Sequence, residues 1–124
     1  VSTAGVTRED HVLREVAPGW LDWHAATEAA LRGSGAPYTI VRPGGLTDGP
    51  AGVQALRLAQ GDRASGFLAR ADLARLCVAA LETPEAAGRT FEVWAGSPAV
   101  RADLATQLAS LAPDGPGAST TTAE

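Results

Sequence analysis

The sequence contains few side chains that could carry out acid–base, nucleophilic or metal chemistry. Its 124 residues include two histidines, one cysteine and no lysine. Without lysine the chain supplies neither a Schiff base nor the lysine of a phosphate-binding loop. His11, His24 and Cys77 lack the spacing of a zinc site, so we expect no metal centre. Neither Ser2 nor Ser34 lies in the Gly-x-Ser-x-Gly turn that activates a hydrolase serine.

A glycine-containing segment is a stronger candidate for ligand binding. Pro43, Gly44, Gly45 and Leu46 follow a β-rich run, and a glycine lets a ligand approach the backbone because no Cβ intervenes. The segment lacks both the Gly-x-Gly-x-x-Gly order of a dinucleotide loop and the Gly-Lys-Ser/Thr ending of a phosphate loop. From the residues alone, it is either a loop that contacts a ligand or a simple turn.

Composition and charge exclude several classes of function. A net charge of −4 and a pI near 5.1 argue against a nucleic-acid partner, which would favour a basic surface. No apolar run approaches the ~20 residues of a membrane helix. The first five residues lack the basic flank and apolar core of a signal peptide. Cys77 is the only cysteine, so we expect a reduced, cytoplasmic protein.

The elements that would position these residues alternate between helix and strand. A short helical turn is possible at 12–16, and a first clear helix is predicted over 20–32. Its apolar stripe, expected in the core, has helical spacing: Trp20, Trp23, Thr27 and Leu31. A β-rich run at 37–41 has little alternation, which is typical of a strand covered on both faces. Proline and glycines should end it at 42–45, before a loop over 47–52.

The second half of the chain continues this alternation. Residues 54–59 are ambiguous between strand and helix, and 66–69 are a possible short extended segment. Asp72 has the residue type of an N-cap and precedes a second apolar stripe: Leu73, Leu76, Cys77, Ala80 and Leu81. A strand is predicted over 90–94. A last helix should start at Ser97-Pro98 and bury Val100, Leu104, Leu108 and Leu111.

This order predicts an α/β fold with a parallel sheet. The strand at 37–41 requires neighbours on both edges, yet residues 1–3 are only long enough for the end of a strand. The predicted sheet is therefore incomplete on its N-terminal side. From Pro113 onward Gly, Pro, Ser and Thr dominate, and we expect disorder there.

Four blocks of sequence resemble one family, the atypical short-chain dehydrogenase/reductases, and within it the NAD(P)H-binding, NmrA-like branch called sugar-epimerase-like. Residues 28–46 resemble its stretch from a helix into a strand and a Pro-Gly-Gly-Leu turn. Arg70-x-Asp72-Leu73-Ala74 is similar to its Arg-x-Asp-Val-Ala helix start. Residues 88–93 resemble its last core strand, and residues 1–5 resemble the strand end that carries its serine.

The resemblance implies the C-terminal half of a Rossmann-like, doubly wound parallel sheet. Residues 1–112 would form this partial NAD(P)-binding domain, and residues 113–124 would be a disordered tail. The adenine and pyrophosphate sites belong to the other half of such folds, so NAD(P) is implied for the intact family and binding by this chain alone is doubtful. The cofactor's preference for NAD or NADP is also set there.

The resemblance further implies the site residues. Ser2 matches the serine that orients a substrate carbonyl, and residues 43–46 match the loop that contacts the nicotinamide carboxamide. His24 occupies the position of the family's lysine and Trp20 that of the tyrosine, so the Tyr-x-x-x-Lys pair is absent. His24 either hydrogen-bonds a ribose, pairs with Glu28, or has no role. Ser2 either binds substrate or caps a strand.

Two classes of function follow. The first is a truncated NAD(P)-binding oxidoreductase-like protein that carries the nicotinamide-side and substrate-side half of a site, acting on an unknown small molecule. The second is a non-catalytic NAD(P)H redox sensor, or an interaction module that assembles into a homo-oligomer through its open sheet edge. Neither requires nucleic acid or a membrane.

Overall fold

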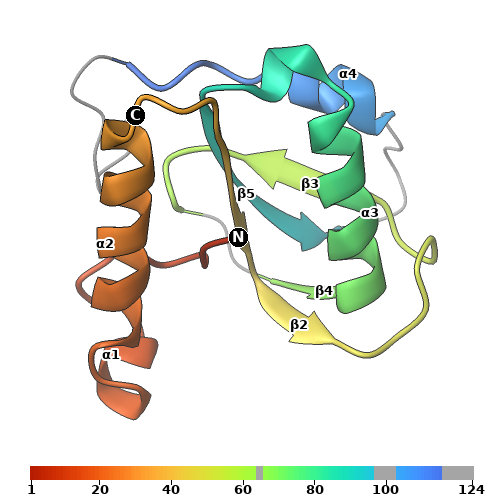
Figure 1. The fold of residues 1–124 in the computed structure, drawn as a ribbon. Helices are drawn as coiled ribbons and strands as arrows, with labels where there is room; N and C mark the ends of the chain where they lie inside the picture. Colours follow the sequence, from red (N-terminus) through yellow and green to blue (C-terminus); the bar gives the residue numbers. More distant parts are fainter. Residues whose placement is uncertain (64–65, 97–102, 116–124) are drawn as a thin grey trace.

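The computed structural model describes residues 1–63, 66–96 and 103–115. These residues form an α/β arrangement of three layers, shown in Figure 1. The central sheet has the order β1 (Thr39–Pro43), β5 (Arg89–Ala95), β3 (Leu56–Ala59). Helix α2 (Trp20–Gly33) lies on one side of this sheet and α3 (Arg70–Leu81) on the other. The predicted α/β class is confirmed.

Shorter elements complete the described part of the chain. They are α1 (Leu13–Val16), β2 (Gly45–Thr47), β4 (Phe67–Ala69), a 3-10 turn (Pro84–Ala86) and α4 (Leu104–Ala109). β2 and β4 pair in parallel and form a second, two-stranded sheet. The ambiguous segment is therefore a strand, β3, and the extended segment after it is β4. Ser97, Pro98 and Val100, expected in the last helix, lie outside the described residues.

The main sheet is mixed rather than fully parallel. β1 and β5 run parallel, with Val41 opposite Phe91 and Arg42 opposite Glu92. β3 is antiparallel to β5 and forms the far edge. On the other edge the first residues accompany β1, because the backbone N–H of Ser2 donates to the Val41 carbonyl at 2.7 Å. Residues at the start of the chain thus lie as the end of a strand, as the sequence predicts.

Pro43 does not end β1 where the sequence predicts a break. The strand includes Pro43, and β2 starts two residues later. The reason lies in the direction of its missing N–H. The Pro43 carbonyl accepts from Ala4 N at 3.0 Å, so the proline nitrogen faces the edge segment, while Gly44 N donates to Val93 O in the sheet interior at 3.0 Å. Proline is tolerated because only this edge pairing is weakened.

The face of the sheet toward α3 carries the hydrophobic core. Strand residues Val41, Phe91 and Val93 pack there against Leu73 and Leu76 of α3. The remaining buried members of this cluster come from β3, β4, the end of α3, the 3-10 turn and α4: Leu56, Leu68, Ala80, Ala86 and Leu108. The predicted stripe of α3 is correct except for Leu81, which is 88% exposed just before the helix ends.

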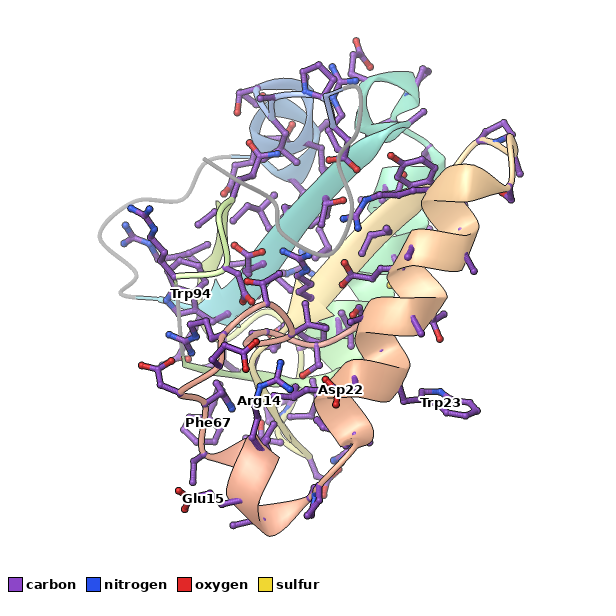
Figure 2. The ribbon with its side chains drawn as sticks, turned by 90° about the vertical axis from the view of Figure 1, so that its left-hand side faces the viewer. Arg14, Glu15, Asp22, Trp23, Phe67 and Trp94 are labelled. Atoms are coloured by element: carbon purple, nitrogen blue, oxygen red, sulfur yellow. The ribbon has the colours of Figure 1, made fainter. Side chains whose placement is uncertain are left out.

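The buried stripe of α2 differs from the predicted one. Trp23 is 73% exposed and Trp20 is 43% exposed, whereas Leu21 and Glu28 are buried. Figure 2 shows Trp23 pointing away from the sheet. The helix is therefore rotated by one residue, about 100°, relative to the apolar stripe. The physical reason is an ion pair: Glu28 is held inside by Arg42 of β1, and the tryptophans are turned outward as a result.

Two further predictions about local structure need correction. α3 begins at Arg70 with Ala69 as its N-cap, so Asp72 lies in the first turn, where its buried carboxylate accepts from Gly52 N at 3.0 Å. α4 does have an aspartate N-cap, Asp103, which accepts from Thr106 N. Ordered chain also extends past residue 112, because the Asp114 side chain accepts a hydrogen bond from Tyr38 Oη at 2.7 Å. Residues 116–124 lie outside the described residues.

Candidate functional site

Ser2 is the candidate residue with the clearest structural signature. Its backbone pairing with Val41 places it opposite Arg42, and residues opposite each other in a sheet project to the same face. The Ser2 side chain is therefore on the α2 side of the sheet. Its hydroxyl oxygen is buried and has no hydrogen-bond partner among the described residues, a property shared only with Arg8 Nε. A buried hydroxyl without a partner is costly unless a ligand supplies one.

His24 lies on the same side of the sheet as Ser2. It shares the inner face of α2 with Leu21 and Glu28, at helical spacings of three and four residues, and is half-buried. Its ring makes an edge-to-face contact with Trp20, with 4.8 Å between the ring centroids. The expected alternative of a His24–Glu28 pair is not observed, because the Glu28 carboxylate binds Arg42 and Arg32.

The glycines of the 43–46 segment are used by the fold itself. Both backbone N–H groups are occupied: Gly44 donates to Val93 O and Gly45 to Gly66 O at 2.9 Å. A Cβ on Gly44 would collide with the Gly66 carbonyl, and one on Gly45 with the Phe67 ring. The two glycines therefore let Gly66 and β4 pack closely against the segment, whereas the sequence predicts the close approach of a ligand. The segment presents no free glycine amide to a cofactor, whereas the buried Ser2 hydroxyl has no hydrogen-bond partner among the described residues.

A pocket of about 290 Å³ lies beyond this segment. It is bounded by β2, β4, the chain between β2 and β3, and the start of α3. Its lining is mostly apolar, with three polar side chains: Thr47, Gln54 and Asp72. Pockets that bind small molecules are typically apolar with a few oriented polar groups. This pocket is next to the predicted segment, and the sequence does not reveal it because residues 47–52 show only the glycine and proline of a loop.

An ionic layer on the α2 face of the sheet was also missed. The Arg42 guanidinium is fully buried and binds Glu28 through two hydrogen bonds, of 2.9 and 2.7 Å. It also donates to Glu92 of β5 at 3.1 Å. Arg42 and Glu92 are opposite each other in the strand register. The only signal was the residue types, because nothing in the sequence fixes the direction of Arg42, and Glu92 occupies a polar position of an alternating strand.

The electrostatics of this layer follow from its burial. Burial raises the pKa of Glu92 above its ordinary value, although the Asp62 N–H and the Arg42 charge act in the opposite direction. Burial lowers the pKa of the Arg42 guanidinium, but Glu28 and Glu92 outweigh this and the pKa lies above its ordinary value. Arg42 therefore stays charged, and its role is to bind the two carboxylates rather than to exchange protons.

Comparison with known proteins identifies the family. A family profile described as NAD(P)H-binding matches residues 1–84, which is more than half of the chain. The chain belongs to this NAD(P)H-binding family. The match includes the Ser2 strand end, α2 with His24, and the 43–46 segment, so the predicted resemblance is confirmed at the level of the family.

A curated relative is similar in sequence, and two solved structures share the fold. Sanguinarine reductase from Eschscholzia californica is 40% identical over 98 residues, which cover 75% of this chain and 36% of the reductase. The oxidoreductase ylbE from Lactococcus lactis has a TM-score of 0.73 at 18% identity, and a putative NAD-dependent epimerase/dehydratase from Bacillus halodurans has 0.70 at 22%. Each structure covers 89% of this chain, and the chain covers 49% of each. These structures confirm the Rossmann-like fold.

The chain thus spans about a third of the reductase and about half of the two solved structures. Among the described residues, no helix is both long and apolar enough to cross a membrane, and no cluster of histidine, cysteine and acidic residues is arranged to hold a metal ion.

Proposed function

We propose that this chain provides the nicotinamide-side and substrate-side half of an NAD(P)H-dependent oxidoreductase site. The observation that supports this most is the buried Ser2 hydroxyl, which lacks a partner among the described residues and belongs to a segment matched by the NAD(P)H-binding family. A relative named as a reductase favours a reductive reaction. NAD(P)H, when bound, supplies a hydride.

In this proposal the residues of the chain bind and orient. The Ser2 hydroxyl donates a hydrogen bond to the carbonyl oxygen of a small substrate, which polarises the carbonyl and fixes its face. A His24 ring N–H donates to a hydroxyl of the nicotinamide ribose, in place of the family's lysine. Pro43, Gly44, Gly45 and Leu46 support the nicotinamide by van der Waals contact, since the amides of the two glycines are already used within the fold.

The pocket of about 290 Å³ beside β2 and β4 would hold the rest of the substrate. Its apolar lining favours a neutral organic carbonyl compound over a phosphorylated or highly charged one. A reduced compartment such as the cytoplasm suits this chain, because its single cysteine, Cys77, is free.

The proposal is tested by NMR on the isotope-labelled chain. Each half of the cofactor is added separately, and the amide signals that shift are recorded. Reduced nicotinamide mononucleotide should shift the amide signals of Ser2 and residues 44–46, and adenosine monophosphate should not shift them. In the presence of the reduced mononucleotide, cyclohexanone serves as a carbonyl probe and should shift Ser2 further.

Ser2→Ala should abolish the response to cyclohexanone. Thr3→Val is the matched control, because the Thr3 hydroxyl already donates to the Ala4 carbonyl at 3.2 Å, and it should leave the response unchanged. Equal shifts from both cofactor halves, or a cyclohexanone response that survives in Ser2→Ala, would overturn the proposal.

A further inference from the structure

A buried aspartate far along the chain holds the loop that follows Ser2. Asp62 is fully buried, and its carboxylate accepts three hydrogen bonds: from Gly5 N at 2.6 Å, Thr7 N at 2.8 Å and the Thr7 hydroxyl at 2.7 Å. Its backbone is in the left-handed region, at φ 57°, where non-glycine residues are uncommon. Such a conformation persists only when its surroundings enforce it. The 5–7 loop is therefore fixed by a specific contact rather than by packing alone.

Asp62 is itself connected to helix α2 through the sheet. Its backbone N–H donates to one Glu92 carboxylate oxygen at 2.9 Å, and the other Glu92 oxygen accepts from Arg42 at 3.1 Å. Arg42 continues to Glu28 of α2 through its two short hydrogen bonds. The connection Thr7–Asp62–Glu92–Arg42–Glu28 is thus continuous, and every member except Thr7 is at most 2% exposed.

The two ends of this connection are the two segments that carry the candidate site. One end is the loop directly after Ser2, and the other is one helical turn from His24. We propose that the buried connection is a single positioning unit, in which Asp62 and Arg42 act as positioning residues that fix the Ser2 loop relative to the His24 face of α2. This inference rests on the proposed function for its purpose, but its test requires no cofactor.

The cost of leaving buried polar groups without partners makes the contacts of this connection depend on one another. Three directed hydrogen bonds from two backbone N–H groups and a hydroxyl fix the Asp62 carboxylate in one position. Arg42 binds both Glu28 and Glu92, so one buried guanidinium holds two carboxylates on the α2 face of the sheet. Loss of one side chain takes a partner away from its buried neighbour, and the neighbour must then shift to rebuild its hydrogen bonds. A disturbance at one end should therefore reach the other end.

The two histidines report on the two ends separately. The His11 ring fills the space where a Cβ on Gly5 would lie, so its NMR signals report on the loop. The His24 ring contacts Trp20 on α2, so its signals report on the helix. The chain has no other histidine, and both ring signals can be assigned in the intact chain.

Three substitutions test the proposal. Asp62→Asn removes the anionic acceptor, and Thr7→Val removes one hydrogen bond without changing charge or shape. Both should shift the ring signals of His11 and also of His24, with the smaller shift from Thr7→Val. Asp72→Asn is the matched control, since Asp72 is another buried carboxylate that accepts from a loop N–H, Gly52, outside this connection. It should leave both histidines unchanged.

A response confined to His11 in both Asp62→Asn and Thr7→Val would overturn the positioning unit and leave only a local loop contact. If Asp62→Asn fails to fold, Thr7→Val decides the question alone. Failure of the nicotinamide mononucleotide mapping would contradict the proposed function without altering the histidine pattern, so the two failures are distinguishable.

Discussion

The two faces of the central sheet are built from the same two strands but from opposite chemistries. On the α3 side, Val41, Phe91 and Val93 form an apolar layer. On the α2 side, Arg42 and Glu92 occupy the positions between them and are equally buried. The apolar face holds α3 by burial of apolar surface, which is not directional, whereas the ionic face holds α2 by directed hydrogen bonds. Two of the candidate site residues, Ser2 and His24, lie on the ionic face.

The largest expected effect comes from removing the centre of the ionic face. Arg42→Met places an apolar side chain there, leaves the buried Glu92 carboxylate without its arginine, and leaves Glu28 with Arg32 alone. We expect a loss of about 3–5 kcal/mol in the free energy of unfolding, measured by urea denaturation. Adding Glu28→Gln and Glu92→Gln should restore part of this loss. A single Arg42→Met variant as stable as the wild type would show that the ionic face does not hold α2.

The apolar face should respond to a cavity without any such rescue. Leu76 of α3 is fully buried, so Leu76→Ala should lower the free energy of unfolding by about 3 kcal/mol. Leu81→Ala on the same helix is the control, because Leu81 is 88% exposed and its truncation should change stability by less than about 0.5 kcal/mol. Similar losses from the two variants would contradict the described packing of α3.

The ionic face should also give a distinctive pH dependence. Because the folded-state pKa of Glu92 lies above its ordinary 4.5, the folded protein binds this proton more tightly than the unfolded chain. The stability that Glu92 contributes is then fully present at low pH and is lost as pH rises through the folded-state pKa. The stability difference between wild type and Glu92→Gln should accordingly shrink as pH rises above 4.5. A stability difference that grows with pH would show that folding does not raise the pKa of Glu92.

The smallest effect concerns Tyr38, which donates to Asp114. Asp114 in turn binds Arg32, a partner of Glu28 in the ionic layer. Tyr38 is the only tyrosine, so an absorbance titration reports on it alone. Burial, followed by the hydrogen bond to the Asp114 carboxylate and its charge, raises the pKa of Tyr38 above 10.0. Asp114→Asn should lower the titration midpoint, but not to the ordinary value, since burial remains. A midpoint unaffected by Asp114→Asn would show that the 112–115 segment is not anchored there.

The sequence was sufficient to predict the elements whose pattern has a single physical interpretation. The helix over 70–81 has an apolar stripe at helical spacing, and the strand over 89–95 alternates. α3 ends at Leu81, before Pro84, as predicted from the inability of proline to continue a helix. The N-terminal strand end was predicted from β-favouring residues and from the family resemblance. The structure shows that it pairs with Val41.

The ionic layer could not be predicted in the same way. Alternation separates polar from apolar residues but does not reveal that both faces of a strand are buried. Glu92 therefore appears exposed in the sequence, and its partner Arg42 is 50 residues away. The error at Trp23 follows from this, because hydrophobicity alone orients α2 by its tryptophans. Asp62 was not recognised for a similar reason, since its partners are backbone groups at Gly5 and Thr7.

The candidate site was predicted mainly through the family resemblance. Ser2 lies beside β1, the 43–46 segment follows from its end, and His24 lies on α2, which packs on the same side of the sheet as Ser2. The structure adds that the Ser2 hydroxyl has no partner among the described residues and that the glycine amides are already used. Neither property can be predicted from the sequence, because both depend on which atoms of distant segments lie within hydrogen-bond distance of these groups.

The most direct test of the half-site account is a calorimetric titration of the chain with NADPH and, separately, with reduced nicotinamide mononucleotide. The sequence contains no Gly-x-Gly-x-x-Gly loop for the pyrophosphate. We predict that both ligands bind weakly and with the same dissociation constant, because the adenine half of NADPH finds no site. A micromolar dissociation constant for NADPH, well below that of the mononucleotide, would contradict the account.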